Sequence, residues 1–422
     1  MPLTNERVME LRKEFPALQQ TLDGRPIAFF DGPGGTQVHG SVIDAFARYY
    51  TEANSNAHGA FEFSRRTDMT VTLAQEAMAD FINARRPDEI VFGSSMTDLT
   101  FNLSRAIGRV LSPGDEIIVT RLDHDANVAP WVALEEVGIV IRVIDFDPAN
   151  CTLDMDALKV AIGPKTKVVA VGAASNAVGT VSDIAQITKW AHEVGAWMFV
   201  DAVQFAPHAL IDVQQLGVDF LAYSMYKIFG PHMGVLWGRY ELLDRLPAYK
   251  VIPAADVPPD KFQMGTPNFE GMAGATAAIN YIASVGRRFS DVAPDASRRE
   301  QIVAGMTMIH QYEMSLAARL IDGLQTIPGA RIYGITDLAR FDERMPVVSF
   351  TLEGHAPADI AQRLGEEAIF AYYGHFYAIY VTERLNLDAS GGLMRIGINH
   401  YNTADEVDQL LSVIRELAGI SA

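Results

Sequence analysis

The ten residues GAWMFVDAVQ, 195–204, decide the fold of this chain. An apolar run from 196 to 200 ends directly in the carboxylate of Asp201. A short continuous apolar run of this kind is typical of a parallel strand that is buried on both faces. Ligand sites of open α/β sheets lie at the carboxyl ends of such strands, where Asp201 stands. The stretch therefore predicts a parallel sheet with a site at that edge, although a strand-end aspartate can also cap the next helix.

Strand-like and helix-like segments alternate on both sides of this stretch. Strands are predicted at 89–93, 116–120, 140–144, 168–172, 197–200, 220–224 and 234–237. Helix-like segments begin at Leu99, Val128, Met155, Asp183 and Val213. The alternation predicts an α/β fold with a mostly parallel seven-stranded sheet and helices on both faces. The last two strands are separated only by a short loop, so we expect them to pair antiparallel.

The pattern changes from about residue 269. Two long helical stretches, 271–285 and 301–324, are followed by strand candidates at 347–352, 368–371 and 393–399 and by a closing helix at 403–417. Grouping of this kind is typical of a small α+β domain. We expect an N-terminal arm (1–27) that joins the small domain, a large domain (28–285) and a small C-terminal domain (286–422), with the boundary between 265 and 300.

Composition limits the class of protein. The chain has 422 residues, of which 49% are hydrophobic and 20% charged, as in soluble globular proteins. A net charge of -18 disfavours nonspecific nucleic-acid binding, which needs a basic surface. The single cysteine, Cys151, excludes an intramolecular disulfide. A charged N-terminus without an apolar signal core, and the lack of a membrane-length apolar run, lead us to expect a cytoplasmic protein without membrane contact. No metal site is predicted.

A second stretch, SMYKIFGP at 224–231, places Lys227 between an apolar, aromatic run and a Gly-Pro turn. Burial disfavours the ammonium form, and buried lysines form imines with aldehydes; an ordinary solvated lysine is the alternative. Together with Asp201 and Gln204, this lysine predicts pyridoxal 5'-phosphate (PLP). That cofactor needs a lysine for its imine and a carboxylate that keeps its ring nitrogen protonated. Gln204 would donate to the phenolic oxygen of the ring.

Further polar residues follow or interrupt the predicted strands. Hydroxyls and free N–H groups at 94–98 open a helix and could bind an anion, with Ser224 as a second hydroxyl donor; an ordinary helix cap is the alternative. His124 could stack on a flat ring, or be a surface-loop histidine. Asn176 could donate to the ring oxygen, or stabilise a turn. Arg395 suits bidentate capture of a carboxylate, or an ion pair on an edge strand. The glycine turn at 32–36 lacks the GxGxxG spacing of dinucleotide sites, which disfavours a dehydrogenase.

From about residue 15 to 417 the chain resembles the class V aminotransferase group of fold-type I PLP enzymes, and within it the cysteine desulfurase-like branch. The matching motifs are DHDAN (123–127) with PW (130–131), SN (175–176) with GT (179–180), DAVQ (201–204), SMYKIFGP (224–231), GTPN (265–268), and Arg395 with YNT (401–403). The resemblance implies catalytic roles for Lys227, His124 and Asp201. It implies cofactor-binding roles for Met96, Thr97, His124, Asn176, Asp201, Gln204, Ser224, Lys227 and Thr266, and substrate-binding roles for Arg395, Asn176 and His58. Thr266 would reach the phosphate in the neighbouring subunit, which implies a homodimer.

Several residues depart from the pattern of that branch. Tyr226 stands where desulfurases have a histidine before the lysine, and Tyr372 where an arginine is expected. Tyr377 stands where the mobile loop carries the cysteine that takes sulfur as a persulfide. Cys151 lies elsewhere, between a strand and a helix of the large domain, where it reads as an incidental loop cysteine. A tyrosine oxygen does not accept sulfane sulfur, so the persulfide step has no visible nucleophile.

The resemblance and its departures together define the expected function. We expect a PLP-dependent enzyme that acts on a small amino acid through an external aldimine, as a cysteine desulfurase-like C–S lyase without the persulfide cysteine. Lys227 would take the α-proton as general base. A class V aminotransferase, an amino-acid epimerase and a catalytically inactive PLP-binding protein are the alternatives. The tyrosine-rich loop at 372–380 favours a substrate larger than cysteine, or an aromatic one.

Overall fold

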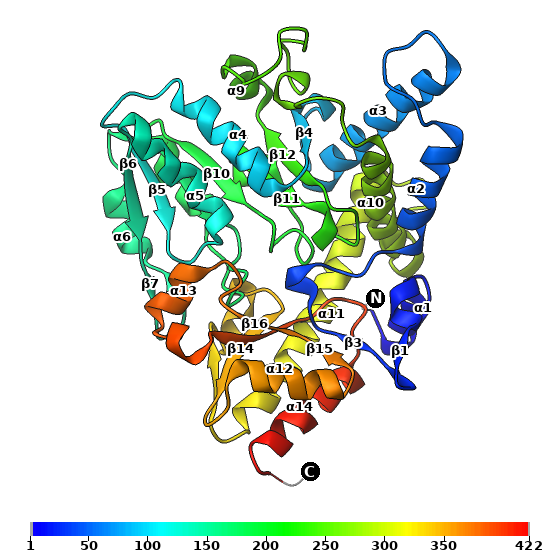
Figure 1. Ribbon diagram of the computed structural model, residues 1–422, viewed down its shortest axis with the longest axis vertical. Coiled ribbons are helices and arrows are strands. Elements are labelled where there is room, and N and C mark those ends of the chain that lie inside the picture. The colour runs from blue at the N-terminus through cyan, green and yellow to red at the C-terminus, as the bar shows by residue number, and fades with distance from the viewer. Residues whose placement is uncertain (1–2, 421–422) are drawn as a thin grey trace.

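The central sheet has seven strands in the order β4-β12-β11-β10-β9-β5-β6, as shown in Figure 1 of this computed structural model, which describes residues 3–420. The strands are β4 (Ile90–Gly93), β5 (Glu116–Thr120), β6 (Val140–Ile144), β9 (Thr166–Gly172), β10 (Trp197–Asp201), β11 (Phe220–Ser224) and β12 (Gly234–Gly238). Each end lies within two residues of its predicted place. Only β12 runs against its neighbours, pairing antiparallel with β11 and β4, which confirms the expected pairing of the last two strands.

Except for the edge strand β6, which is largely exposed, the strands are buried on both faces, as their apolar runs predict. In β9, Val168 and Ala170 face one core, and Val169 and Val171 face the other. Phe199 of β10 faces the same core as Val168, while its neighbours 198 and 200 face the same core as Val169. The alternation follows from the two-residue period of a strand. A parallel sheet covered on both sides leaves only its edges and strand ends open to ligands.

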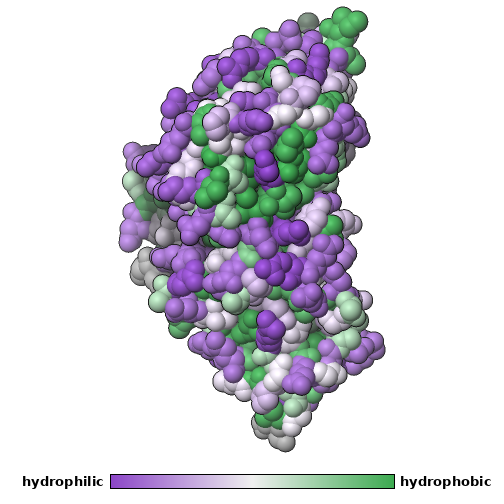
Figure 2. All heavy atoms as spheres, turned by 90° about the vertical axis from the view of Figure 1, so that its left-hand side faces the viewer, coloured by the Kyte–Doolittle hydropathy of each residue, from purple (hydrophilic) through white to green (hydrophobic). Residues whose placement is uncertain are grey.

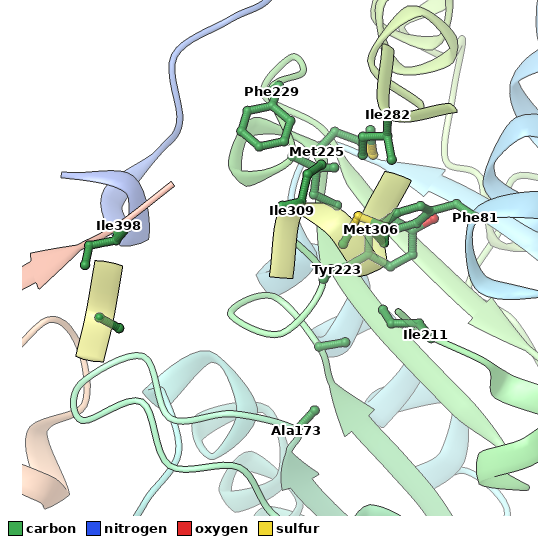
Figure 3. Close-up of a cluster of buried hydrophobic side chains, with 14 of the residues drawn as sticks. Phe81, Ala173, Ile211, Tyr223, Met225, Phe229, Ile282, Met306, Ile309 and Ile398 are labelled. Carbon is green, nitrogen blue, oxygen red and sulfur yellow. The ribbon is translucent and has the colours of Figure 1, made fainter. Parts of the chain in front are cut away.

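Helices cover both faces of the sheet. One face is covered by α4 (Met96–Gly108), α5 (Ala129–Val132) and α9 (Tyr240–Arg245). The other is covered by α3 (Glu62–Ile82), α6 (Met155–Ala161), α7 (Ile184–Glu193), α8 (Val213–Leu216), α10 (Phe269–Phe289) and α11 (Arg298–Gln325). On that second face Met306 and Ile309 of α11 lie against Tyr223 and Met225 at the end of β11 (Figure 3). The long helix α11 therefore passes behind the carboxyl end of the strand that leads to Lys227.

A second sheet follows α11 and has the order β13-β14-β17-β16, all antiparallel. Its strands are β13 (Ala330–Tyr333), β14 (Val347–Leu352), β16 (Tyr372–Gly374) and β17 (Leu393–Gly397). They pack against α11 and α12 (Pro357–Glu366), and these two helices contact α14 (Ala404–Leu417). The expected α+β arrangement is confirmed. The strand expected at 368–371 is shorter, β15 (Ile369–Phe370), and pairs with β3 (Ala28–Phe29) outside this sheet. The boundaries at 27 and 285 stay predictions, and α10 runs past 285.

The N-terminal segment lies against the C-terminal part of the chain (Figure 1). It contains α1 (Asn5–Arg12), β1 (Thr21–Leu22), β2 (Arg25–Pro26), β3 and α2 (Gly40–Glu52). The pairing of β3 with β15 fixes residues 28–29 of this segment, and an ion pair of 2.8 Å between Arg12 and Glu406 fixes the end of α1. These contacts bring the glycine turn at 32–36 over the lysine loop.

The surface on the β6 side mixes hydrophilic and apolar side chains and tapers toward the C-terminus (Figure 2). β6 is an edge strand, and its Arg142 forms an ion pair of 2.8 Å with Glu116 of β5. A charge on an edge strand discourages pairing with other chains.

Between residues 3 and 420, no helix has both the length and the apolar character needed to cross a membrane. The remaining elements, β7 (Phe146–Asp147), β8 (Thr152–Leu153) and α13 (Ile379–Arg384), lie on the same side of the molecule (Figure 1).

Candidate active site

Lys227 is buried at the carboxyl end of β11, on the turn that leads to β12. Its side chain lines two adjoining cavities of about 60 Å³ and about 660 Å³, which share several wall residues. The inner cavity lies under the strand ends and the outer one opens between the two sheets. The apolar run before the lysine therefore does what the sequence predicts, because it carries the amine into a protected site.

The glycine turn holds the lysine loop from above. The Thr36 N–H donates to the Tyr226 carbonyl at 3.0 Å, and the Thr36 hydroxyl accepts from the Phe229 N–H at 2.8 Å. Gly35 has φ 149°, and a Cβ added to it would lie 3.2 Å from the Tyr226 ring. Tyr226 in turn stacks on His232 with ring centroids 5.0 Å apart. The tyrosine that departs from the desulfurase pattern is thus a packed wall of the site.

Asp201 and Lys227 line the same inner cavity, and burial shifts their pKa values in opposite directions. Loss of hydration raises the pKa of Asp201, which is partly offset by the Val203 N–H bonded to its Oδ1 at 2.9 Å. Loss of hydration and the nearby charge of Arg395 lower the pKa of Lys227. Both effects disfavour the charged forms. The lysine can therefore reach its neutral, nucleophilic form more readily than a solvated lysine.

Two amide oxygens in the inner cavity have no hydrogen-bond partner. They are Oδ1 of Asn176 and Oε1 of Gln204, and both side chains are buried. The Nδ2 of Asn176 donates to the Phe376 carbonyl at 2.8 Å, so this amide is tied to the loop from the second sheet. Unpaired buried polar atoms are uncommon and indicate a missing ligand or water. The inner cavity is therefore built for a polar ligand.

His124 separates the inner and outer cavities. Its Nδ1 accepts from the Ala126 N–H at 3.0 Å, which leaves its proton on Nε2. Burial, with Lys227 and Arg395 nearby, lowers the pKa of His124 to about 4, so the ring is neutral at physiological pH. The ring of Tyr377 stacks on it with centroids 5.5 Å apart. The expected flat stacking surface is present, and the loop already covers part of it.

The start of α4 lies at the edge of the inner cavity, where the sequence predicts an anion site. Met96 and Thr97 line it at the first turn of the helix, and Ser224 lines it from β11. The first N–H groups of a helix have no partner within the helix and attract anions. Ser95 is used as the helix cap, since its hydroxyl accepts from the Asp98 N–H at 3.1 Å. The cap therefore uses Ser95 and leaves Met96 and Thr97 to line the cavity.

Arg395 comes from β17 and closes the outer cavity from below. Its Nη1 donates to the Asn176 carbonyl at 3.0 Å, and its guanidinium lies 3.9 Å from the centroid of the Phe376 ring. Its Nε has no partner although it is buried. β17 lies between β14 and β16, so the alternative of an edge-strand ion pair is wrong. The free edge of the guanidinium suits a carboxylate.

The outer cavity is lined by aromatic side chains of the loop that follows β15. Tyr372, Tyr373, Phe376 and Tyr377 line it, and the Tyr377 carbonyl accepts from the Asp125 N–H at 2.8 Å. Phe376 and Tyr377 both have left-handed backbone conformations, with φ 55° and 57°. Strained backbone of this kind clusters at functional sites. The loop is held in place by carbonyl contacts to residues on the β5 and β9 ends.

Three residues of interest lie outside both cavities. His58 is in an exposed loop, where its Nδ1 lies 3.2 Å from Asp68 Oδ1. Thr266 is also exposed and lines a different cavity with Ser94 and Asp98. Cys151 is buried with φ 56°, and burial raises the pKa of its thiol to about 11. The roles of His58 and Thr266 stay predictions.

Sequence reasoning missed three groups beside the site. Asp123 is buried next to Asp201, and burial raises its pKa to about 8. Asp31 lies near Arg395 with its Oδ1 unpaired, and burial raises its pKa to about 6. Phe376 packs on the arginine. Asp123 lies within the quoted DHDAN motif, Phe376 within the tyrosine-rich loop at 372–380, and Asp31 directly after the apolar run 27–30. The sequence does not show that the fold brings these distant segments together at the site.

Comparisons of the whole chain with known proteins point to one family. The family model described as "Aminotransferase class-V" matches residues 28–293 and 300–410. A probable cysteine desulfurase of Mycolicibacterium paratuberculosis is 34% identical over 97% of this chain and 58% of its own length. A cysteine desulfurase of Serratia proteamaculans is 31% identical over 97% of this chain and 98% of its own length. The chain thus spans less than two thirds of the mycobacterial relative.

Solved structures give the same result. An apo cysteine desulfurase of Thermococcus onnurineus NA1 has a TM-score of 0.85 and 28% identity, over 97% of this chain and 98% of that chain. A cysteine desulfurase of Escherichia coli, in an S-sulfonic acid form, has a TM-score of 0.84 and 27% identity, over 99% of this chain and 100% of that chain. The likeness covers both sheets and the helices between them.

Proposed function

Because the chain belongs to the class V aminotransferase family, whose members use PLP, we propose that it is a PLP-dependent enzyme that cleaves a carbon–sulfur bond in an amino acid. One observation carries the proposal: the amine of Lys227 and the carboxyl of Asp201 are buried in the walls of one cavity. An aminotransferase, an epimerase and an inactive PLP-binding protein are the alternatives.

The inner cavity fits the cofactor in its polar chemistry. Asp201 would hold the ring nitrogen, and the ring oxygen would lie within the reach of Asn176 and Gln204, whose amides each have an unpaired atom. The first turn of α4, with Thr97 and Ser224, would hold the phosphate. The face of His124 would lie against the ring. When bound, PLP supplies an electron sink that acidifies bonds at the α-carbon of an amino acid.

The residues of this chain then have separable tasks. Arg395 binds the substrate carboxylate through the guanidinium edge that the Asn176 carbonyl leaves free. Lys227 takes the α-proton on Nζ as general base, which its lowered pKa favours. His124 keeps its proton on Nε2, where it can donate a hydrogen bond to a leaving group. The aromatic loop keeps bulk water from the reacting atoms.

The fate of sulfur distinguishes this chain from a persulfide-forming desulfurase. Tyr377 occupies the mouth of the outer cavity, and Cys151 lines neither cavity of the site. Burial raises the pKa of the Cys151 thiol, and the thiolate is the nucleophilic form. We therefore propose release of sulfur into solution. With cysteine, the balanced reaction is cysteine plus water to hydrogen sulfide, pyruvate and ammonia.

The aromatic outer cavity favours a substrate larger than cysteine. Its volume of about 660 Å³ and its tyrosine and phenylalanine walls suit a cysteine thioether with a planar or apolar substituent. The same observation leaves an aminotransferase of aromatic amino acids as the second candidate. Assays of sulfide or thiol, pyruvate and keto acid across a panel of amino acids separate the two, since only the lyase releases sulfur.

The cofactor is tested by absorbance. Protein supplied with PLP is expected to show a visible band that borohydride reduction removes and that Lys227→Ala lacks. Lys261→Ala is the matched control, because Lys261 is equally buried but donates to the Asp244 carbonyl at 2.7 Å, away from the cavity. Absence of the band from wild-type protein contradicts the proposed function. A band without turnover of any amino acid favours the inactive binding protein.

The proposed enzyme is a homodimer, in which Thr266 reaches the phosphate of the neighbouring site. Two segments expose large apolar side chains, as interfaces do. They are residues 43–73 with Ile43, Tyr50, Phe61, Phe63, Met69 and Leu73, and residues 249–264 with Tyr249, Val251, Ile252, Val257 and Met264. Thr266 follows the second segment directly and is itself exposed. A second copy that covers these segments would bury them and the threonine together.

A further inference from the structure

A buried row of polar side chains runs from the inner cavity into the protein. Gln204 Nε2 lies 3.1 Å from His208 Nε2, and His208 Nδ1 lies 2.8 Å from Glu313 Oε2. Glu313 Oε1 lies 3.9 Å from His400 Nδ1, and His400 Nε2 lies 2.5 Å from the Tyr281 hydroxyl. All five residues are at most 3% exposed. The row therefore connects a wall of the cofactor cavity to α10 and α11.

Glu313 lies where a carboxylate is poorly tolerated. It follows Ile309 by four residues on α11, so it lies on the same helix face, beside the apolar cluster behind the lysine loop (Figure 3). The basic side chains nearest its carboxyl group are two histidines, His208 and His400, and its neighbour His310 bonds to the His208 carbonyl. An unpaired buried charge is expensive, so such a group is retained as a neutral acid or for a purpose.

The row admits two matched arrangements of protons. In the first, ionised Glu313 accepts from His208 Nδ1, His208 Nε2 accepts from the Gln204 amide nitrogen, and the Gln204 oxygen faces the cavity. In the second, neutral Glu313 donates to His208 Nδ1, and His208 Nε2 donates to the Gln204 oxygen. The amide is then turned by half a rotation, and its nitrogen faces the cavity as a donor. The protonation of Glu313 thus decides whether Gln204 offers an acceptor or a donor.

Glu313 is fully buried, and within residues 3–420 no ion pair joins it to a lysine or arginine. Burial therefore favours the second arrangement, although the structure places the Gln204 amide as in the first, with Nε2 toward His208 and Oε1 unpaired. Burial raises the pKa of Glu313 well above its usual range, and His310 and the His400 N–H oppose this only in part. Burial also lowers the pKa of His208 and of His400 to about 3, so neither ring is a cation that would stabilise a carboxylate. The hydroxyls of Tyr281, Tyr312 and Tyr401, which lie in the same region, are neutral because burial raises their pKa values.

We propose that His208 and Glu313 are positioning residues that hold the Gln204 amide with its nitrogen toward the ring oxygen of the cofactor. Neutral Glu313 donates a hydrogen bond to His208 Nδ1, and His208 Nε2 in turn donates to the Gln204 oxygen. Neither residue touches the cofactor. The proposal rests on the proposed function for the identity of the ligand, but the hydrogen-bond order from Glu313 to Gln204 is a property of the protein alone.

The first experiment titrates the visible band of the PLP-loaded protein against pH. Glu313→Gln keeps a donor toward His208, so the midpoint stays at the wild-type value. Glu313→Met removes the donor, releases the amide, and moves the midpoint up by about one pH unit, because the ring oxygen loses a donor and holds its shared proton more tightly. Tyr312→Phe is the control, since it removes a buried hydroxyl of the same helix, which bonds to the Asn402 carbonyl.

Two outcomes of the titration overturn the proposal: an unchanged midpoint in Glu313→Met, or a shifted one in Glu313→Gln. If Glu313→Met and Tyr312→Phe both lower the melting temperature and neither moves the midpoint, Glu313 has only a structural role, and the proposal is overturned. The melting temperature is therefore recorded for each variant beside the midpoint.

The second experiment needs neither a variant of Glu313 nor the cofactor. Nitrogen-15 NMR of histidine-labelled, PLP-free protein reports which ring nitrogen of His208 carries the proton, with the signals assigned by their loss in His208→Gln. A proton on Nε2 and a bare Nδ1 are expected. A proton on Nδ1 refutes the neutral-donor arrangement. If wild-type protein shows no PLP band, the proposed function fails, and this measurement still decides the arrangement of the row.

Discussion

Arg395 has one edge bonded within the protein and one edge free, which makes its role testable at the level of a single group. Its Nη1 is held by the Asn176 carbonyl, and its plane is fixed by Phe376 at 3.9 Å. Arg395→Lys keeps the charge but loses the planar fork. We expect KM for an amino acid to rise by about 10- to 100-fold, as for the loss of a charge-assisted hydrogen bond.

The control for this prediction is an amine that lacks the carboxylate. Its binding to wild-type protein and to Arg395→Lys, followed by the spectral change of the cofactor, should be equal. Arg384→Lys, which alters a surface ion pair with Asp145 near the same loop, should leave both ligands unaffected. If the amine and the amino acid are affected alike, Arg395 supports the structure of the loop and does not bind the carboxylate.

Tyr377 permits a gain-of-function prediction. By the resemblance to desulfurases, its loop position is expected to match that of their sulfur-accepting cysteine, and its ring stacks on His124. We expect Tyr377→Cys, made in a Cys151→Ser background, to accumulate reductant-releasable sulfur on the protein after incubation with cysteine. The wild-type protein and Cys151→Ser should accumulate none and release sulfide instead. Sulfur on wild-type Cys151 contradicts the proposed release into solution.

The residues that the sequence predicts for the site share a local signal. Asp201, His124 and Lys227 each follow an apolar strand, so their place at the carboxyl edge can be read without the structure. Glu313 carries no such signal, and Asp31 follows only the short apolar run 27–30, of which two residues form β3. Each becomes important only because a distant segment folds beside it, the turn after β10 in the first case and β17 in the second. Sequence periodicity cannot predict such contacts.

At the scale of elements, the start of α4 and the start of β12 approach each other very closely. A Cβ on Gly234 would lie 2.5 Å from the Met96 nitrogen and in comparable contact with the Ser95 backbone. Gly234→Ala must therefore displace the first turn of α4. Overpacking of this kind lowers the free energy of unfolding by about 1–3 kcal/mol. We expect weaker PLP retention and faster loss of the band on dilution.

The matched control is Gly163→Ala, because a Cβ there meets no atom within 4 Å. It should change neither the melting temperature nor the retention of PLP. Equal retention of PLP by Gly234→Ala and wild-type protein would show that the α4 start is not the phosphate site.

The elements differ in how well the sequence predicts them, for a physical reason. β9 to β11 are buried on both faces, so apolar runs mark them clearly. β16 is three residues long, with Tyr372 and Tyr373 half exposed, and it exists as a strand only through its pairing with β17. The sequence does not predict that β15 pairs with β3, because an apolar run shows that a strand is buried but not which strand it pairs with.

At the scale of the whole molecule, Asp123 links stability to pH. Its folded pKa, about 8, lies above the unfolded value of 3.8 because the carboxyl is buried beside Asp201. The folded state therefore binds the proton more tightly, so this group stabilises the fold below pH 4 and that contribution is lost as the pH rises to about 8. Asp123→Asn should remove this slope.

The measurement is denaturant unfolding of both proteins at several pH values between 5 and 8, in the same cofactor state. The advantage of wild-type protein over Asp123→Asn should shrink steadily as the pH rises. The substitution also changes the contact with Asn127 at 3.1 Å, but this effect does not depend on pH. It therefore shifts the difference in unfolding free energy by a constant and leaves its slope against pH unchanged. A constant difference across this range would mean that Asp123 is ionised in the folded protein.

The proposed dimer predicts that two kinds of hybrid dimer, each built from two different subunits, differ in how well they retain PLP. Thr266 shares a cavity of about 390 Å³ with Ser94 and Asp98 of its own chain, so the rival is a role within its own subunit. A hybrid of Lys227→Ala with Thr266→Ala subunits has one complete site if Thr266 acts on its neighbour, because the subunit that keeps Lys227 receives the native threonine. The same hybrid has no complete site if Thr266 acts on its own subunit.

A hybrid of wild-type subunits with the double variant Lys227→Ala/Thr266→Ala gives the opposite outcomes and is the matched control. Differently tagged subunits allow each hybrid to be purified, and the rate at which PLP dissociates from the single lysine-bearing site is the readout. We expect wild-type retention in the first hybrid and rapid loss in the second, because only the neighbour's hydroxyl would complete the phosphate site. The reverse result places Thr266 in its own subunit, and equal rates in both hybrids remove it from the phosphate site.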